Sequence, residues 1–159
     1  MKQIRGGVTA AKGFLAEGIH VGIRKNKEKK DLALVYSEVP CAAAAVYTTN
    51  KVIGQPLVVT KEHLADGTAQ AIIVNSGNAN TCTGEAGIQA ARRMAALVAS
   101  KLPVKATDVV VASTGVIGQP LDVSPLEAGP AAAVAGATAM LDVSDGLLGD
   151  LGRLARASG

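Results

Sequence analysis

The chain has 159 residues and a formal net charge of +3, a length typical of one compact domain. Hydrophobic residues make up 48% of it and aromatic residues only 2%, so we expect a core of alanine, valine, leucine and isoleucine. The sequence has no collagen-like glycine period, no signal-peptide core and no long apolar window, which argues against a fibrous, secreted or membrane-spanning protein. We expect a soluble, cytoplasmic, globular protein.

The excess positive charge gathers in the segment RKNKEKKD, which holds Arg24, Lys25, Lys27, Lys29 and Lys30. Glu28 and Asp31 stand beside these cations and no aromatic residue interrupts them. This pattern favours a solvated loop over a nucleic-acid contact. Cys41 and Cys82 lack metal-ligand spacing, so two reduced structural thiols are expected.

The first half of the chain predicts several strands. Gly18–Ile23 and Asp31–Tyr36 flank the basic segment and indicate a hairpin with a polar tip. Cys41–Tyr47 fits helix or strand by periodicity alone, but its place after a proline favours a short buried strand. Leu57–Thr60 and Ala71–Asn75 are short runs rich in β-branched residues, typical of buried strands.

The segment SGNANTCTG that follows is too polar and too rich in glycine for a regular element, and predicts a shaped loop. Residues 84–101 are predicted to form a helix, with Thr83 as its cap and Glu85 in its first turn. Asp108–Ala112 predicts another strand, and residues 113–115 (Ser-Thr-Gly) predict a turn after it.

The composition changes beyond Pro120, because residues 123–139 are mostly alanine, glycine and proline. We therefore expect two parts, a domain over residues 1–122 and a junction with a helix over 123–159. Ser144 is the expected cap of that amphipathic helix. One face of the helix carries Leu147, Leu148, Leu151 and Leu154.

Three asparagines, Asn75, Asn78 and Asn80, lie in the loop between a predicted strand and helix, where ligands often bind. They are candidate substrate-binding residues. The alternative is that their side chains satisfy backbone groups of the loop, as asparagine does in turns. The sequence does not decide between the two.

Ser113, Thr114 and Gly115 form the second candidate site. A hydroxyl beside a glycine N–H can direct two donors at one point, as an oxyanion hole requires. The alternative is an ordinary turn at the end of a strand. His20 and His63 stand apart from each other and from any paired acid, so we expect no histidine-based triad.

These segments together resemble a known family. The motifs are KGF, GIHVGI, DLALVY, CAAAAVYTTNKV, AIIVNSGNANTCTGEAG and VVVASTGVIGQPL, which run from about Gly6 to Leu121. They are similar, in order and spacing, to the bifunctional glutamate N-acetyltransferase and ornithine acetyltransferase family of arginine biosynthesis. NSGNAN with CTG, and STGVIG, are the most specific blocks.

The resemblance implies acetyl transfer from N-acetylornithine to glutamate by a ping-pong route through an acetylated threonine, without an external cofactor. It implies a layered α/β (α+β) sandwich, with Thr114 and Gly115 at the oxyanion positions. It also implies an α chain that pairs with a β chain bearing the nucleophilic threonine, in a cytoplasmic α₂β₂ assembly. No nucleic acid or membrane partner is implied.

This sequence departs from the family pattern, since the Thr-Thr-Asp-Thr type motif that carries the nucleophile is absent. We therefore expect an acyltransferase fragment that is incomplete as an isolated chain. A non-catalytic domain that binds a small ligand or another subunit is the alternative.

The tail over residues 125–159 resembles the carboxy-terminal domain of thiamine-monophosphate kinases, most closely in LDVSDGLLG. Asp142 and Asp145 are the matching acids there. They predict a Mg–ATP phosphate-binding fragment only if that tail is functional. Helix capping is the simpler interpretation of this acidic pair, and no other metal site is expected.

Overall fold

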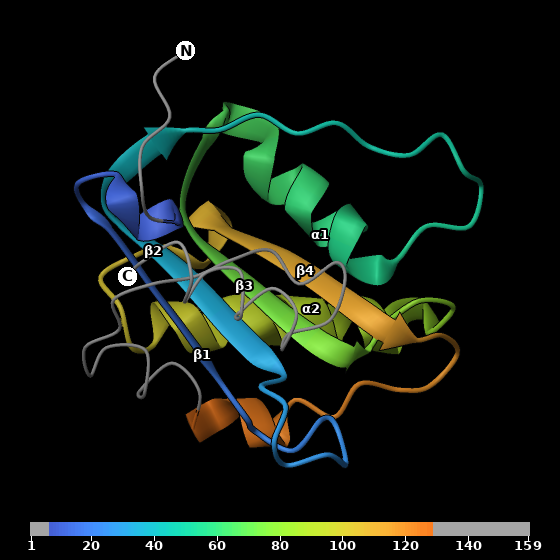
Figure 1. Ribbon diagram of the computed structural model, residues 1–159. Coiled ribbons are helices and arrows are strands. Elements are labelled where there is room, and N and C mark those ends of the chain that lie inside the picture. Colours follow the sequence, from blue (N-terminus) through green and yellow to red (C-terminus); the bar gives the residue numbers. More distant parts are fainter. Residues whose placement is uncertain (1–6, 129–159) are drawn as a thin grey trace.

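The computed structural model describes residues 7–128, and the structural statements below refer to this part of the chain. One mixed sheet, with strand order β1-β2-β3-β4, packs against two helices (Figure 1). The strands are β1 (Phe14–Ile19), β2 (Leu32–Ala42), β3 (Thr68–Asn78) and β4 (Val109–Val116), and the helices are α1 (Gln55–His63) and α2 (Gly84–Ala99). Only β3 and β4 pair in parallel. The α/β class is confirmed, whereas the predicted carboxy-terminal helix lies outside the described residues.

The predicted hairpin is confirmed as β1 and β2, with Ile19 opposite Leu32 at its last antiparallel pair. Its first strand begins and ends earlier than predicted. Beyond Ile19 the chain folds around the carboxylate of Asp31, which accepts hydrogen bonds from the backbone N–H groups of Val21 and Arg24. These N–H groups are therefore not available to extend the ladder.

The prediction of a buried strand over Cys41–Tyr47 is wrong. Strand β2 ends at Ala42 after a register shift between Tyr36 and Cys41, and the chain then leaves the sheet as a long loop (Figure 1). Val46 in this loop is 99% exposed. Pro40 lies within the irregularity and has no N–H to donate to a ladder.

The prediction of a strand over Leu57–Thr60 is also wrong, because these residues form part of α1. Proline is favoured in the first turn of a helix, and Pro56 occupies that place in α1. The hydroxyl of Thr60 accepts a hydrogen bond from the N–H of Val111 at 2.9 Å and donates one to its carbonyl at 2.8 Å. Helix α1 therefore covers the free edge of β4. The β-branched residues of this run could not indicate that position, because β-propensity is a local signal.

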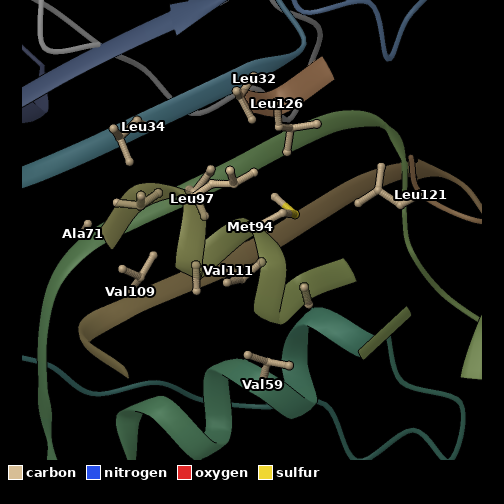
Figure 2. Close-up of a cluster of buried hydrophobic side chains, with 14 residues drawn as sticks. Leu32, Leu34, Val59, Ala71, Met94, Leu97, Val109, Val111, Leu121 and Leu126 are labelled. Carbon is tan, nitrogen blue, oxygen red and sulfur yellow. The ribbon is translucent and has the colours of Figure 1, made fainter. Parts of the chain in front are cut away.

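Helix α2 agrees with the predicted helix to within two residues at its end, and Thr83 is its N-cap residue, although without a capping side-chain bond. Its apolar face packs on the sheet to form an aliphatic core (Figure 2). The core includes Leu34, Ala71, Ile73, Val109 and Val111 of the sheet, Ala91, Met94, Ala95 and Val98 of α2, and Leu126. The predicted aliphatic composition of the core is confirmed.

Three further features complete the fold. Cys41 and Cys82 are free thiols, as predicted. Neither helix within residues 7–128 has the length and apolar character needed to cross a bilayer. In that same range no three histidine, cysteine, aspartate or glutamate side chains gather into a metal-binding group.

Candidate functional site

The candidate site lies where the parallel strands β3 and β4 end together. Asn75 pairs with Ser113, Ser76 with Thr114, and Gly77 with Gly115. The predicted loop therefore begins only after Asn78, and the predicted turn over residues 113–115 is wrong, because these residues belong to β4. Parallel pairing continues to the ends of both strands, which brings the two predicted motifs side by side.

Gly115 allows the two strand ends to approach closely. Gly115 has a φ of +135°, and a Cβ built on it would lie 2.5 Å from the backbone nitrogen of Asn78 and 2.6 Å from the carbonyl oxygen of Gly77. Real Cβ atoms do not approach backbone atoms this closely. Position 115 is therefore restricted to glycine by both backbone conformation and space.

Thr114 presents a free hydroxyl next to this glycine. Successive side chains of a strand point to opposite faces, so Thr114 and Ser76 lie on the face away from the helices, while Ser113 and the fully buried Asn75 face the core. Thr114 is exposed. Its hydroxyl makes no hydrogen bond with any side chain or backbone group of residues 7–128. The predicted oxyanion pair thus combines an exposed hydroxyl with a glycine.

The three asparagines are buried and their amides bind backbone carbonyls. Asn75 donates to the carbonyl of Asn78 at 2.8 Å, Asn78 donates to the carbonyls of residues 119 and 120, both at 3.1 Å, and Asn80 donates to that of Gly87 at 2.8 Å. The side-chain oxygen of Asn78 also accepts from the N–H of Asn80 at 2.7 Å. These bonds tie the end of β3 to α2 and to the segment after β4, which favours the structural alternative. Direct substrate binding by the asparagines stays a prediction.

Two buried polar atoms at the site have no partner in the structure, the Oδ1 of Asn75 and the Oγ of Ser113. The two residues are direct neighbours across β3 and β4, on the core side of the strand pair. A buried polar atom without a partner is destabilising. Ser113 directly precedes the exposed Thr114 in β4.

Asp31 organises the loop that reaches the site from the hairpin. Its side chain is fully buried and accepts hydrogen bonds from the N–H groups of Val21 at 2.7 Å, Gly22 at 3.2 Å and Arg24 at 2.8 Å. His20 Nδ1 lies 3.2 Å from the same carboxylate. The prediction that His20 stands apart from any acid is therefore wrong. The sequence did not predict this pair, because His20 and Asp31 are eleven positions apart in a polar loop and no regular period links them.

Arg24 also lies at the site, although the sequence predicted it to lie in a solvated loop. Its Nε donates to the Oγ of Ser76 at 3.2 Å, and its Nη2 donates to the same oxygen. The methylene Cγ of Arg24 lies over Gly77. Arg24 is only half-exposed, in contrast to Lys25 and Lys27, so the cluster is solvated only in part.

Comparison with known proteins connects this site to one family. The model of the ArgJ family matches residues 15–149. Arginine biosynthesis bifunctional proteins ArgJ from Symbiobacterium thermophilum and Gloeobacter violaceus are 50% and 53% identical to this chain, each over 136 residues. The aligned part is 85% of this chain but only 34% and 33% of those proteins. The chain therefore spans about a third of the length of these relatives.

Two solved structures share the fold. The crystal structure of the arginine biosynthesis bifunctional protein ArgJ from Bacillus halodurans matches with a TM-score of 0.74 at 48% identity, over 79% of this chain and 65% of that one. Ornithine acetyltransferase from Mycobacterium tuberculosis, crystallised with ornithine, matches with a TM-score of 0.76 at 41% identity, over 82% and 70%. The predicted likeness of the tail to thiamine-monophosphate kinases finds no support, and Asp142 and Asp145 lie outside the described residues. With a family match over most of its length and relatives of this similarity, the chain belongs to the ArgJ family.

Proposed function

We propose that this chain forms the oxyanion side of an acetyltransferase that moves the acetyl group of N-acetylornithine to glutamate. Membership of the ArgJ family supports this proposal. So does the likeness to a protein named ornithine acetyltransferase that was crystallised with ornithine. The role in arginine biosynthesis follows from the names of the curated relatives.

The exposed pair formed by Thr114 and Gly115 carries the proposal. During acyl transfer the carbonyl oxygen of the acetyl group gains negative charge, and donors already in place stabilise it. Thr114 offers a hydroxyl without a partner among residues 7–128, and Gly115 is exposed and has no side chain of its own beside its backbone N–H. The asparagine network holds the adjoining loop, so we give Asn75, Asn78 and Asn80 an indirect role in shaping the site.

A complementary chain is needed for turnover under this proposal. Residues 1–159 contain no Thr-Thr-Asp-Thr type motif, and the family resemblance implies a β chain that bears the nucleophilic threonine in an α₂β₂ assembly. The threonine oxygen forms a bond to the acetyl carbon, the bond from that carbon to the ornithine nitrogen breaks, and the leaving amine takes the hydroxyl proton. The amine of glutamate then bonds to the acetyl carbon, the ester bond to threonine breaks, and a proton of that amine returns to the threonine oxygen. No cofactor takes part, because the acetyl group is carried on the protein.

Acetyl transfer from N-acetylornithine to labelled glutamate tests the proposal. The assay is run with the purified chain alone and after co-expression with the complementary segment of the Symbiobacterium thermophilum relative. We expect transfer only in the second case. Binding of ornithine without transfer in either case would instead favour a non-catalytic ligand-binding domain.

Thr114→Val tests the oxyanion role within the active complex, because it removes the hydroxyl and keeps the shape. Loss of one oxyanion donor typically lowers kcat about 10²- to 10³-fold. Thr107→Val is the matched control, since Thr107 is an exposed threonine outside the site, and it should leave kcat unchanged. Equal activity of the two variants would remove Thr114 from the mechanism.

A further inference from the structure

We propose that Arg24 binds the carboxylate of the amino-acid substrate beside Thr114, an inference that rests on the proposed acetyltransfer and names what recognises its substrate.

Both the backbone and the side chain of Arg24 are held at the site. Its backbone N–H binds the buried carboxylate of Asp31 at 2.8 Å, and the carbonyl of Asp31 accepts the N–H of Ser76 at 2.8 Å. These two bonds hold the loop between β1 and β2 at the end of β3, and the course of this loop can be followed in Figure 1. The guanidinium group then reaches the Oγ of Ser76, and Ser76 is the direct neighbour of Thr114.

The missing side chain at position 77 makes room for this arrangement. A Cβ on Gly77 would lie 2.8 Å from the Cγ of Arg24, so the arginine stem occupies the space that a side chain would take. Gly77 is also the direct neighbour of Gly115. Gly77 therefore makes room for the arginine stem, and Gly115 lets the two strand ends approach closely.

The guanidinium group keeps a free pair of donors. Arginine has five N–H donors in a rigid fork. Nε and Nη2 both donate to Ser76, which leaves both hydrogens of Nη1 and the second hydrogen of Nη2. These two terminal nitrogens form the fork that matches a carboxylate with two parallel hydrogen bonds.

Arg24 also lacks a counter-charge within residues 7–128. Two other cations there are paired, Lys30 with Glu17 at 3.2 Å and Arg92 with Glu62 at 2.7 Å. Arg24 is half-buried, yet no carboxylate of the described chain pairs with its side chain. A partly desolvated cation without a partner favours binding of an anion.

The ligand class follows from the neighbouring chemistry. N-acetylornithine and glutamate both carry an α-carboxylate, and the acyl-transfer site is one strand away at Thr114. Lys25 and Lys27 of the same loop are exposed, so water and salt screen their charges from the site. Arg24 is the member of this cluster that the structure fixes against the site.

The test compares N-acetylornithine with its carboxamide, which lacks the negative charge. Both are titrated by calorimetry into the complex with the complementary chain, using wild type, Arg24→Gln, Arg24→Lys and the control Lys27→Gln. We expect wild type and the Lys27 control to bind the carboxylate about 10- to 100-fold more tightly than the amide, as charge-assisted hydrogen bonds imply. Arg24→Gln should remove this preference, and Arg24→Lys should keep only part of it. Far-ultraviolet circular dichroism establishes that each variant is folded.

A carboxylate preference that survives in Arg24→Gln would overturn the inference, and so would wild-type binding that does not distinguish the two compounds. Acetyl transfer is measured on the same samples, so that failure of the Arg24 inference can be distinguished from failure of the proposed function. Transfer with an unchanged preference would leave the acetyltransferase proposal standing without Arg24. A preference that depends on Arg24 without any transfer would support the binding role and refute the catalytic one.

Discussion

Replacing Gly115 by alanine should destabilise the protein strongly, because the change acts on both backbone and packing. An alanine at a φ of +135° is strained by about 1–3 kcal/mol. Its Cβ would also press on the backbone of Gly77 and Asn78 at 2.5–2.6 Å, and overpacking of this kind typically adds about 1–3 kcal/mol. The sum, about 2–6 kcal/mol, is a large part of the ~5–15 kcal/mol that stabilises a typical domain.

Gly118→Ala is the matched control for this prediction. Gly118 also has a positive φ, +79°, but nothing lies within 4 Å of the Cβ that alanine would add. Gly118→Ala should therefore lose only the free energy of unfolding that backbone strain costs. Urea denaturation followed by circular dichroism gives both free energies of unfolding. If the two variants lose the same stability to within about 0.5 kcal/mol, a margin comparable to ordinary surface substitutions, the steric argument for the paired glycines is wrong.

Three further predictions concern the buried and exposed polar groups. Thr60→Val should lower the free energy of unfolding by about 1–3 kcal/mol in urea denaturation, because Val111 then loses both side-chain hydrogen bonds; no loss would refute the role of α1 at the strand edge. Ser113→Ala should be neutral or slightly stabilising in the same assay, since the buried Oγ has no partner; a loss above about 1 kcal/mol would reveal one. The pKa of Asp66 is lowered by hydrogen bonds from the side chain and backbone of Thr68, so its small stabilising effect should be present near neutral pH and disappear as the pH falls through that lowered pKa. Thr68→Val should raise the Asp66 pKa toward its ordinary value in an NMR titration, and an unchanged pKa would contradict the assigned cause.

The elements that could be predicted from the sequence are those with a local pattern. The 3.6-residue period of apolar side chains predicted α2, and short β-branched runs predicted the centre of β3 and the first half of β4. The polar segment between two apolar runs predicted the β1–β2 hairpin. The motifs NSGNAN and STGVIG indicated the family. Each of these signals lies within about 20 neighbouring residues, close to the range over which period and composition carry information.

Which groups meet at the site depends on contacts between segments that are far apart in the chain. The run at Leu57–Thr60 favours a strand locally, yet it lies in a helix whose Thr60 binds the edge of β4. Arg24 and Ser76 are 52 positions apart, so no local pattern joins them. The asparagine amides could point to a ligand or to the loop, and the positions of backbone carbonyls in two other segments determine that they point inward. Contacts between distant segments depend on how the sheet and helices pack, and that packing is a property of the whole chain.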